Sequence, residues 1–222
     1  KQYDIGPIDY MGNWNERPWG TADWTKKFKK AMEGAGFANT QIIIPDGGGA
    51  SGIEQAIDAD PDFKAVMKDG GIGLHYPCNR PSPQVESKYG LKYWSSEDYS
   101  TVGNWAGAAC WGRILNQNGV RMNMTSTISW SLIWSVYGTG FPYFGNGLMY
   151  AMTPWSGFYE AGQDGTDNGA AIWTNAHTCQ FTEVGWKYLA NGKGAGTLSG
   201  GGSYVTLVSP DSAPCTLVVE KL

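Results

Sequence analysis

Strand-like and helix-like stretches alternate along most of the chain. Apolar or alternating runs typical of strands lie at 8–14, 41–44, 71–76, 92–97 and 125–134. Apolar positions with helical spacing lie between them at 24–35, 53–67 and 105–115, and Pro61 divides the second of these helices in two. This alternation predicts a parallel sheet with crossover helices, which is an α/β fold.

The pattern changes after about residue 195. The glycines at 200–202 precede an alternating run at 203–208, a turn at Pro210–Asp211 and a second run at 216–220. Two such runs around a short turn predict a β-hairpin. We therefore expect one α/β region over 1–195 and the beginning of an all-β unit over 196–222.

Composition and charge narrow the class of ligand. The 222 residues include 32 Gly, 11 Trp and 12 Tyr, and the net charge is −4. This charge argues against a nucleic-acid partner, and the lysines of 26–30 fit a solvated helix face better than a phosphate-binding track. No apolar run approaches the roughly 18 residues that a transmembrane helix requires. Abundant Trp and Tyr with glycine-rich loops suit a protein that stacks against sugars.

The cysteines and histidines give little sign of a metal centre. Cys78, Cys110, Cys179 and Cys215 are widely spaced without a C-x-x-C pair, and the chain has only two histidines. A zinc site is therefore not expected, and no motif indicates another metal or a cofactor. The four cysteines fit one or two disulfides as well as four free thiols.

Two glutamates follow predicted strands. Glu16 comes directly after the first strand, and Glu97 ends the fourth. The carboxyl ends of parallel strands form the active sites of α/β barrels, and retaining glycosidases need two carboxyl groups about 5–5.5 Å apart. The alternative for each glutamate is a structural ion pair at a strand end.

Several short motifs are spread over nearly the whole chain, at 14–17, 72–77, 94–98, 110–118, 124–128, 154–157, 176–182 and 201–205. In sequence and in order they resemble glycoside hydrolase family 59, the galactosylceramidases. The resemblance implies strands 4 to 8 of a (β/α)8 TIM barrel over 1–195, followed by the beginning of a β-sandwich domain over 196–222. The first three strands would be missing, so we expect an incomplete fragment of a larger enzyme, poorly soluble and inactive alone.

The resemblance also assigns roles to individual residues. Glu16 would be the proton donor and acceptor, Glu97 the nucleophile, and Asn15 the residue that holds the sugar 2-hydroxyl. His75 is expected either to orient a catalytic carboxylate or to be an ordinary core histidine. Trp130 and Tyr143 match positions near the sugar, with core packing as the alternative, and Tyr143 could also donate a hydrogen bond to Glu97.

The implied activity is retaining hydrolysis of the β-galactosidic bond of a galactosylceramide-type glycolipid. The alternatives are a related enzyme acting on another β-glycoside and a non-catalytic carbohydrate-binding protein. The resemblance further implies a saposin-like activator protein that presents the lipid, and a lysosomal or secreted location. It also implies that Cys110 has a disulfide partner beyond the end of this chain.

Overall fold

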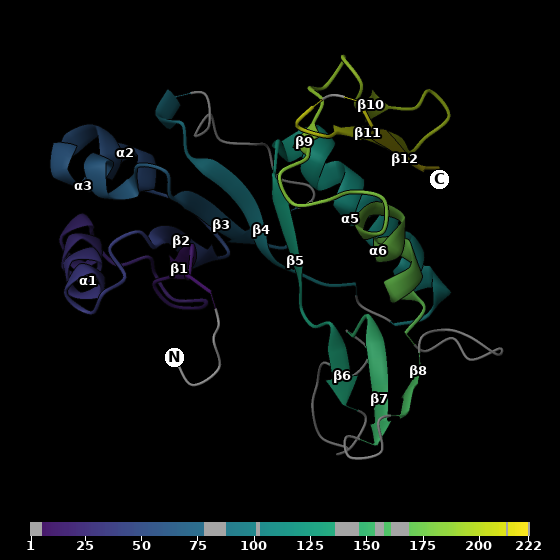
Figure 1. Ribbon diagram of the computed structural model, residues 1–222, viewed down its shortest axis with the longest axis horizontal. Coiled ribbons are helices and arrows are strands. Elements are labelled where there is room, and N and C mark those ends of the chain that lie inside the picture. Colours follow the sequence, from purple (N-terminus) through teal and green to yellow (C-terminus); the bar gives the residue numbers. More distant parts are fainter. Residues whose placement is uncertain are drawn as a thin grey trace. The chain divides into compact units, whose positions relative to one another are not determined.

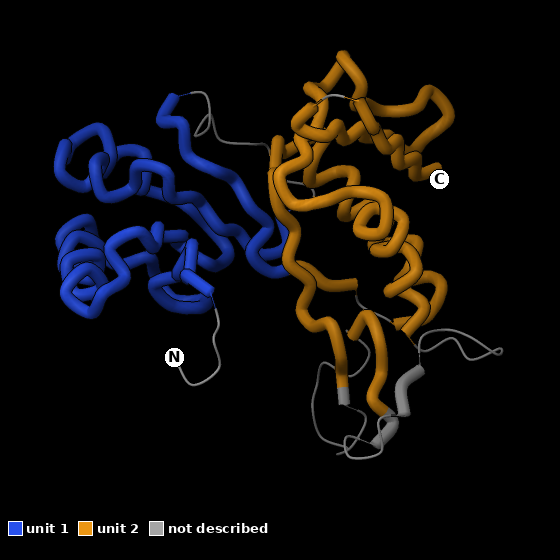
Figure 2. Tube along the Cα trace, viewed as in Figure 1, with its two compact units in different colours: residues 1–77, 82–97 blue, residues 78–81, 98–222 orange. Residues whose placement is uncertain are grey.

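The described residues fall into two compact units. The computed structural model describes residues 6–77, 88–100, 103–135, 147–153, 158–160, 169–211 and 213–221. Unit 1 comprises 1–77 and 82–97, and unit 2 comprises 78–81 and 98–222 (Figure 2).

Unit 1 is built on a parallel sheet. Strands β1 (Tyr10–Gly12), β2 (Gln41–Gly47), β3 (Gly71–His75) and β4 (Lys92–Asp98) pair in this order, each parallel to the next (Figure 1). The connecting helices are α1 (Ala22–Gly34), α2 (Ile53–Ala59) and α3 (Pro61–Met67). The predicted strand–helix alternation is confirmed here, and the first strand is shorter than the expected 8–14.

Local side chains explain where these helices begin. The Thr21 hydroxyl accepts the Trp24 N–H at the start of α1. Asp60 accepts the Phe63 N–H at 2.9 Å, so Pro61 begins α3 instead of interrupting one long helix. The Asp60 carboxylate also binds the Lys26 ammonium at 2.6 Å, and this contact lowers the pKa of Asp60. The predicted break at Pro61 is confirmed.

The core of unit 1 lies on β2, β3 and the helices that cover them. Ile42 and Ile44 of β2 are fully buried, and so are Phe63 and Ile57 of the helices. Strands buried on both faces have continuous apolar runs, which is why 41–44 reads as a strand. The expected end of this strand at Ile44 is wrong, because β2 continues through Pro45 and Asp46 to Gly47 with a bulge in its pairing to β3.

Gly70 carries a stability prediction. A Cβ at this position would lie 2.5 Å from the Ile42 carbonyl oxygen and 3.0 Å from that of Met67, so backbone would have to move. In the full-length protein we expect Gly70→Ala to lower the free energy of unfolding by about 2 kcal/mol, measured by denaturant titration. Gly34→Ala is the control, because a Cβ there meets nothing within 4 Å. Equal midpoints for the two variants would contradict the prediction.

Unit 2 contains a long helix. Helix α5 (Trp105–Met122) continues beyond the predicted end at 115, and the Asn104 side chain caps it by accepting the Gly107 N–H. The predicted run at 125–134 is in fact two strands, β5 (Ser126–Ser129) and β6 (Ile133–Ser135). The two strands belong to different sheets. Strand β6 pairs with β7 (Met149–Thr153), which in turn pairs with β8 (Phe158–Glu160).

The predicted hairpin is confirmed within a small antiparallel sheet. Strand β11 (Ser203–Val208) pairs with β12 (Cys215–Glu220) on one side, and with β9 (Lys187–Tyr188) and β10 (Gly196–Thr197). Inward-facing Val205 and Leu207 pack on Val120 of α5, and helix α6 (Ala171–Cys179) lies beside α5 (Figure 1). The β-sandwich and the boundary at residue 195 stay predictions.

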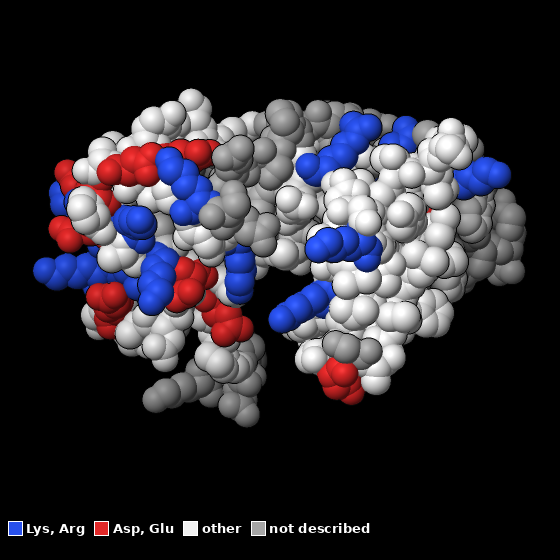
Figure 3. All heavy atoms as spheres, turned by 90° about the horizontal axis from the view of Figure 1, so that it is seen from above, with Lys and Arg blue, Asp and Glu red and all other residues white. Residues whose placement is uncertain are grey.

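Surface features complete the description of the fold. In Figure 3, Lys and Arg are mixed with Asp and Glu at the left of the view, whereas Lys and Arg predominate at the right. Cys110, Cys179 and Cys215 are free thiols, whereas Cys78 lies outside the described residues. Among the helices that the structure describes, none has the length and hydrophobicity needed to cross a membrane.

Candidate active site

Glu16 lies in a loop that is anchored to the end of β2. The loop follows β1, and the Asn13 amide donates to the Trp19 carbonyl at 2.8 Å across it. The Glu16 N–H donates to the Asp46 carbonyl at 2.9 Å, and Glu16 has a left-handed backbone with φ of 52°. Non-glycine residues rarely adopt this conformation, so the backbone of Glu16 is held in place by its surroundings.

Two β-bulges on either side of β3 aim acidic side chains at His75. Between β2 and β3, Pro45 pairs with Gly73 and Gly47 with Leu74, so Asp46 is the extra residue. Between β3 and β4, Leu74 pairs with Ser95 and His75 with Glu97, so Ser96 is the extra residue. Bulges change the direction of nearby side chains and are common beside active sites. Here they place Asp46 and Glu97 on opposite sides of the last residue of β3.

His75 is the centre of this cluster, and its side chain is only 1% exposed. Its Nδ1 lies 3.2 Å from Oε1 of Glu16 and 3.8 Å from Oε2 of Glu97. Its Nε2 lies 3.1 Å from Oδ1 of Asp46. A buried imidazole with an acidic partner at each nitrogen has a fixed ring orientation. His75 is thus a well-satisfied buried histidine, and its role in orienting a catalytic carboxylate stays a prediction.

The two glutamates differ in exposure and in partners. The side chain of Glu16 is 57% exposed and that of Glu97 is 15% exposed. The Tyr76 hydroxyl donates to Oε1 of Glu97, and the Tyr76 N–H donates to the Glu97 carbonyl at 3.0 Å. Two contacts with Tyr76 thus hold Glu97 in a defined orientation. Glu16, by contrast, is open to exchange protons with solvent.

The spacing of these groups suits one chemistry particularly well. One ligand atom each from Glu16, His75 and Glu97 lies within 4.8 Å of the others. Retaining glycosidases likewise hold two carboxyl groups close together, roughly 5–5.5 Å apart. The same three side chains are close enough to hold a metal ion, although double displacement at a sugar requires none.

The remaining predicted site residues are Asn15, Trp130 and Tyr143. Asn15 is exposed and precedes Glu16 in the same loop. Trp130 is half-buried in unit 2, where its ring packs edge-on against Tyr99 and Trp134. Tyr143, the expected donor to Glu97, lies outside the described residues. The structure thus brings together Glu16, His75 and Glu97 from unit 1.

Sequence reasoning missed Asp46 and Tyr76. Pro45-Asp46-Gly47 has the composition of a turn, which hides the acidic residue at the carboxyl end of β2. Its position at a strand end, the criterion applied to Glu16 and Glu97, was the available signal. Tyr76 directly follows β3 with a left-handed φ of 50°, and nothing in the sequence indicates that conformation.

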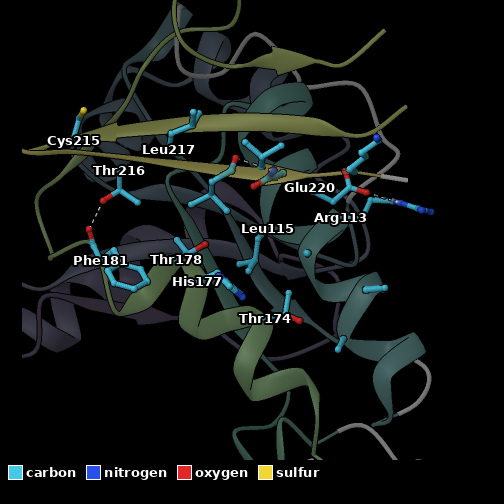
Figure 4. Close-up of a pocket in the computed structure, with 17 residues that line it drawn as sticks. Arg113, Leu115, Thr174, His177, Thr178, Phe181, Cys215, Thr216, Leu217 and Glu220 are labelled. Carbon is cyan, nitrogen blue, oxygen red and sulfur yellow. Dashed lines mark hydrogen bonds and ion pairs between the residues drawn. The ribbon is translucent and has the colours of Figure 1, made fainter. Parts of the chain in front are cut away.

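A cavity of about 830 Å³ in unit 2 is lined by neither Glu16 nor Glu97. It lies between β12 and helices α5 and α6, and its lining includes Leu217 and His177 (Figure 4). Arg113 and Glu220 form an ion pair at 3.9 Å there. The cavity lacks a pair of close carboxyl groups, so it does not offer the chemistry of the cluster around His75.

Comparison with known families agrees with the geometry. The model of glycosyl hydrolase family 59 matches residues 1–180. The chain belongs to this family. The predicted resemblance to the galactosylceramidases is therefore confirmed, on a match that includes both glutamates and His75.

Curated relatives extend over the whole chain. It is 42% identical to the galactocerebrosidase of Macaca mulatta and 40% identical to those of Mus musculus and Homo sapiens. In each case 100% of this chain is aligned, and it spans about 30% of the relative's length.

Solved structures support the fold. SrfJ from Salmonella typhimurium matches with a TM-score of 0.63 at 10% identity, over 90% of this chain and 50% of that one. The glycoside hydrolase family 30 xylanase Xyn30A from Clostridium acetobutylicum matches with a TM-score of 0.58 at 16% identity, over 91% and 51%. At these identities the likeness concerns the fold alone, and it agrees with a parallel half-barrel sheet.

Proposed function

We propose that the protein carrying this chain is a retaining glycoside hydrolase that cleaves the β-galactosidic bond of galactosylceramide-type glycolipids. The observation that carries the proposal is the approach of Glu16 and Glu97 to within 4.8 Å around His75. Membership of family 59 and the galactocerebrosidase relatives support the substrate class.

The first half of the reaction forms a glycosyl–enzyme. A carboxylate oxygen of Glu97 attacks the anomeric carbon while the bond to the aglycone oxygen breaks, and Glu16 transfers its proton to that oxygen. The Tyr76 hydroxyl, which donates to Oε1 of Glu97, orients this carboxylate before the attack.

The second half returns the enzyme to its starting state. Glu16, now ionised, removes a proton from water, and the water oxygen attacks the anomeric carbon as the bond to Glu97 breaks. Two inversions give net retention, so galactose leaves as the β-anomer. In this proposal Asn15 holds the 2-hydroxyl, and Trp130 and Tyr143 contribute to the sugar site.

A lipid substrate adds two further elements to the proposal. A sugar–lipid bond at a membrane surface is difficult to reach, so we include a saposin-like protein that presents the lipid as a partner. The galactocerebrosidase relatives also favour a lysosomal location for the whole protein.

The stereochemistry of hydrolysis tests the proposal. The full-length protein is mixed with an aryl β-galactoside, and the first-formed sugar is observed by proton NMR before mutarotation. We expect β-galactose from wild type, with aryl β-glucoside and β-xyloside hydrolysed far more slowly. First-formed α-galactose would contradict the mechanism, and a preference for the glucoside or xyloside would contradict the substrate class.

A further inference from the structure

Asp46 is the acidic neighbour of His75 that has no direct task in double displacement. Its Oδ1 lies 3.1 Å from Nε2 of His75, and its carbonyl oxygen accepts the Glu16 N–H at 2.9 Å. A Cβ at Gly12 would lie 3.0 Å from the Asp46 Oδ2, so the glycine leaves room for this carboxylate. One residue in a β-bulge thus fixes both the backbone of Glu16 and the ring of His75.

The contacts of Asp46 determine which nitrogen of His75 carries hydrogen. An ionised carboxylate only accepts hydrogen bonds, so the contact with Asp46 is satisfied when the N–H is on Nε2. Nδ1 of a neutral ring then presents a lone pair to Oε1 of Glu16 at 3.2 Å. A hydrogen bond forms there only if Glu16 is protonated, or if the ring takes a second proton and donates it to ionised Glu16.

Both arrangements place one proton between Glu16 and His75. Among the described residues, the titratable groups facing the imidazole are Glu16, Asp46 from β2, Glu97 from β4 and Tyr76, whose ring centroid lies 5.5 Å away. Three of these groups are carboxyls, and each negative charge favours a proton nearby. Asp46 is the one that contacts Nε2, on the opposite side of the ring from the shared proton.

We infer that Asp46 is a positioning residue that retains a proton on the Glu16–His75 pair, so that Glu16 is in the acid form that the first step consumes. This inference rests on the proposed function. It accounts for a buried histidine between two acids, and for the ability of Glu16 to donate a proton although its own side chain is largely exposed.

Asp46→Asn in the full-length protein is the test. The amide oxygen still accepts the Nε2–H, but the negative charge is lost, so the proton on the pair is held less strongly. We expect the alkaline limb of the kcat/KM profile to move to lower pH by roughly one unit. Asp69→Asn is the matched control, because Asp69 is exposed, precedes β3 at its far end, and shares the left-handed backbone of Asp46, with φ of 63° and 57°. It should leave the profile unchanged.

The leaving group separates loss of acid catalysis from structural damage. A dinitrophenyl β-galactoside needs little protonation, whereas an alkyl β-galactoside needs it fully. Near neutral pH we expect Asp46→Asn to slow the alkyl substrate roughly 10-fold and to leave the dinitrophenyl substrate nearly unchanged. An unmoved alkaline limb, or equal loss with both substrates, would overturn the inference.

A measurement without turnover keeps the two proposals distinguishable. If wild type hydrolyses no galactoside, the proposed function fails, but the hydrogen positions on His75 can still be read by ¹⁵N NMR of histidine-labelled protein. His75→Gln assigns the signals. We expect hydrogen on Nε2 across the neutral range, and a ring with hydrogen on Nδ1 alone would overturn the inference.

Discussion

Replacing Glu97 with alanine is expected to abolish turnover while leaving the fold intact. Without a carboxylate at this position no glycosyl–enzyme forms, and we expect kcat/KM for an aryl β-galactoside to fall by about 10⁴-fold, equivalent to about 5 kcal/mol of transition-state stabilisation. The melting temperature should not fall, because the change removes one of three acidic groups around His75. Hydrolysis rates with wild-type and variant full-length protein provide the measurement.

Rescue by azide tests whether Glu97 is the nucleophile, and not merely whether the residue is needed for activity. In Glu97→Ala, azide can occupy the space of the lost carboxylate and attack the activated dinitrophenyl β-galactoside from the opposite face. We expect α-galactosyl azide as the product. Glu33→Ala is the control, because Glu33 is an exposed acidic residue of α1 in the same unit. Undiminished hydrolysis by Glu97→Ala would refute the assignment of the nucleophile.

Replacing Glu16 with alanine is expected to give a loss that depends on the leaving group. General acid catalysis contributes about 10²–10⁴-fold, so hydrolysis of an alkyl β-galactoside should fall within that range. For the dinitrophenyl substrate, formation of the glycosyl–enzyme should stay fast and its hydrolysis should become slow. A burst of dinitrophenol equal to the enzyme concentration is the expected observation in a stopped-flow measurement.

Azide again distinguishes the two glutamates. In Glu16→Ala, azide attacks the glycosyl–enzyme that Glu97 has formed, so the product should be β-galactosyl azide, with a faster steady state. The opposite anomers from the two variants form a matched pair. If Glu16→Ala instead gave the α-azide, the roles of Glu16 and Glu97 would have to be exchanged.

Much of unit 1 was predictable because its signals are local. The apolar run at 41–44 indicates a strand buried on both faces, and Asp60 before Pro61 indicates a new helix start. Because strand ends of parallel sheets meet at one edge, their positions made Glu16 and Glu97 candidates, and the resemblance to family 59 assigned their roles. The end of α5 was harder to predict, because the polar run Asn-Gln-Asn-Gly at 116–119 is typical of a loop, whereas its first three residues are buried within the helix.

The amino-acid sequence by itself determined which residue types are present, the order of strands and helices, and which acidic residues follow strands. Only the tertiary structure decided that Asp46 and Glu97 both face His75, and that Tyr76 donates to Glu97. Those contacts depend on two β-bulges and on left-handed residues at Glu16, Asp46 and Tyr76. A bulge is a property of the pairing between two strands, so neither strand's own sequence encodes it.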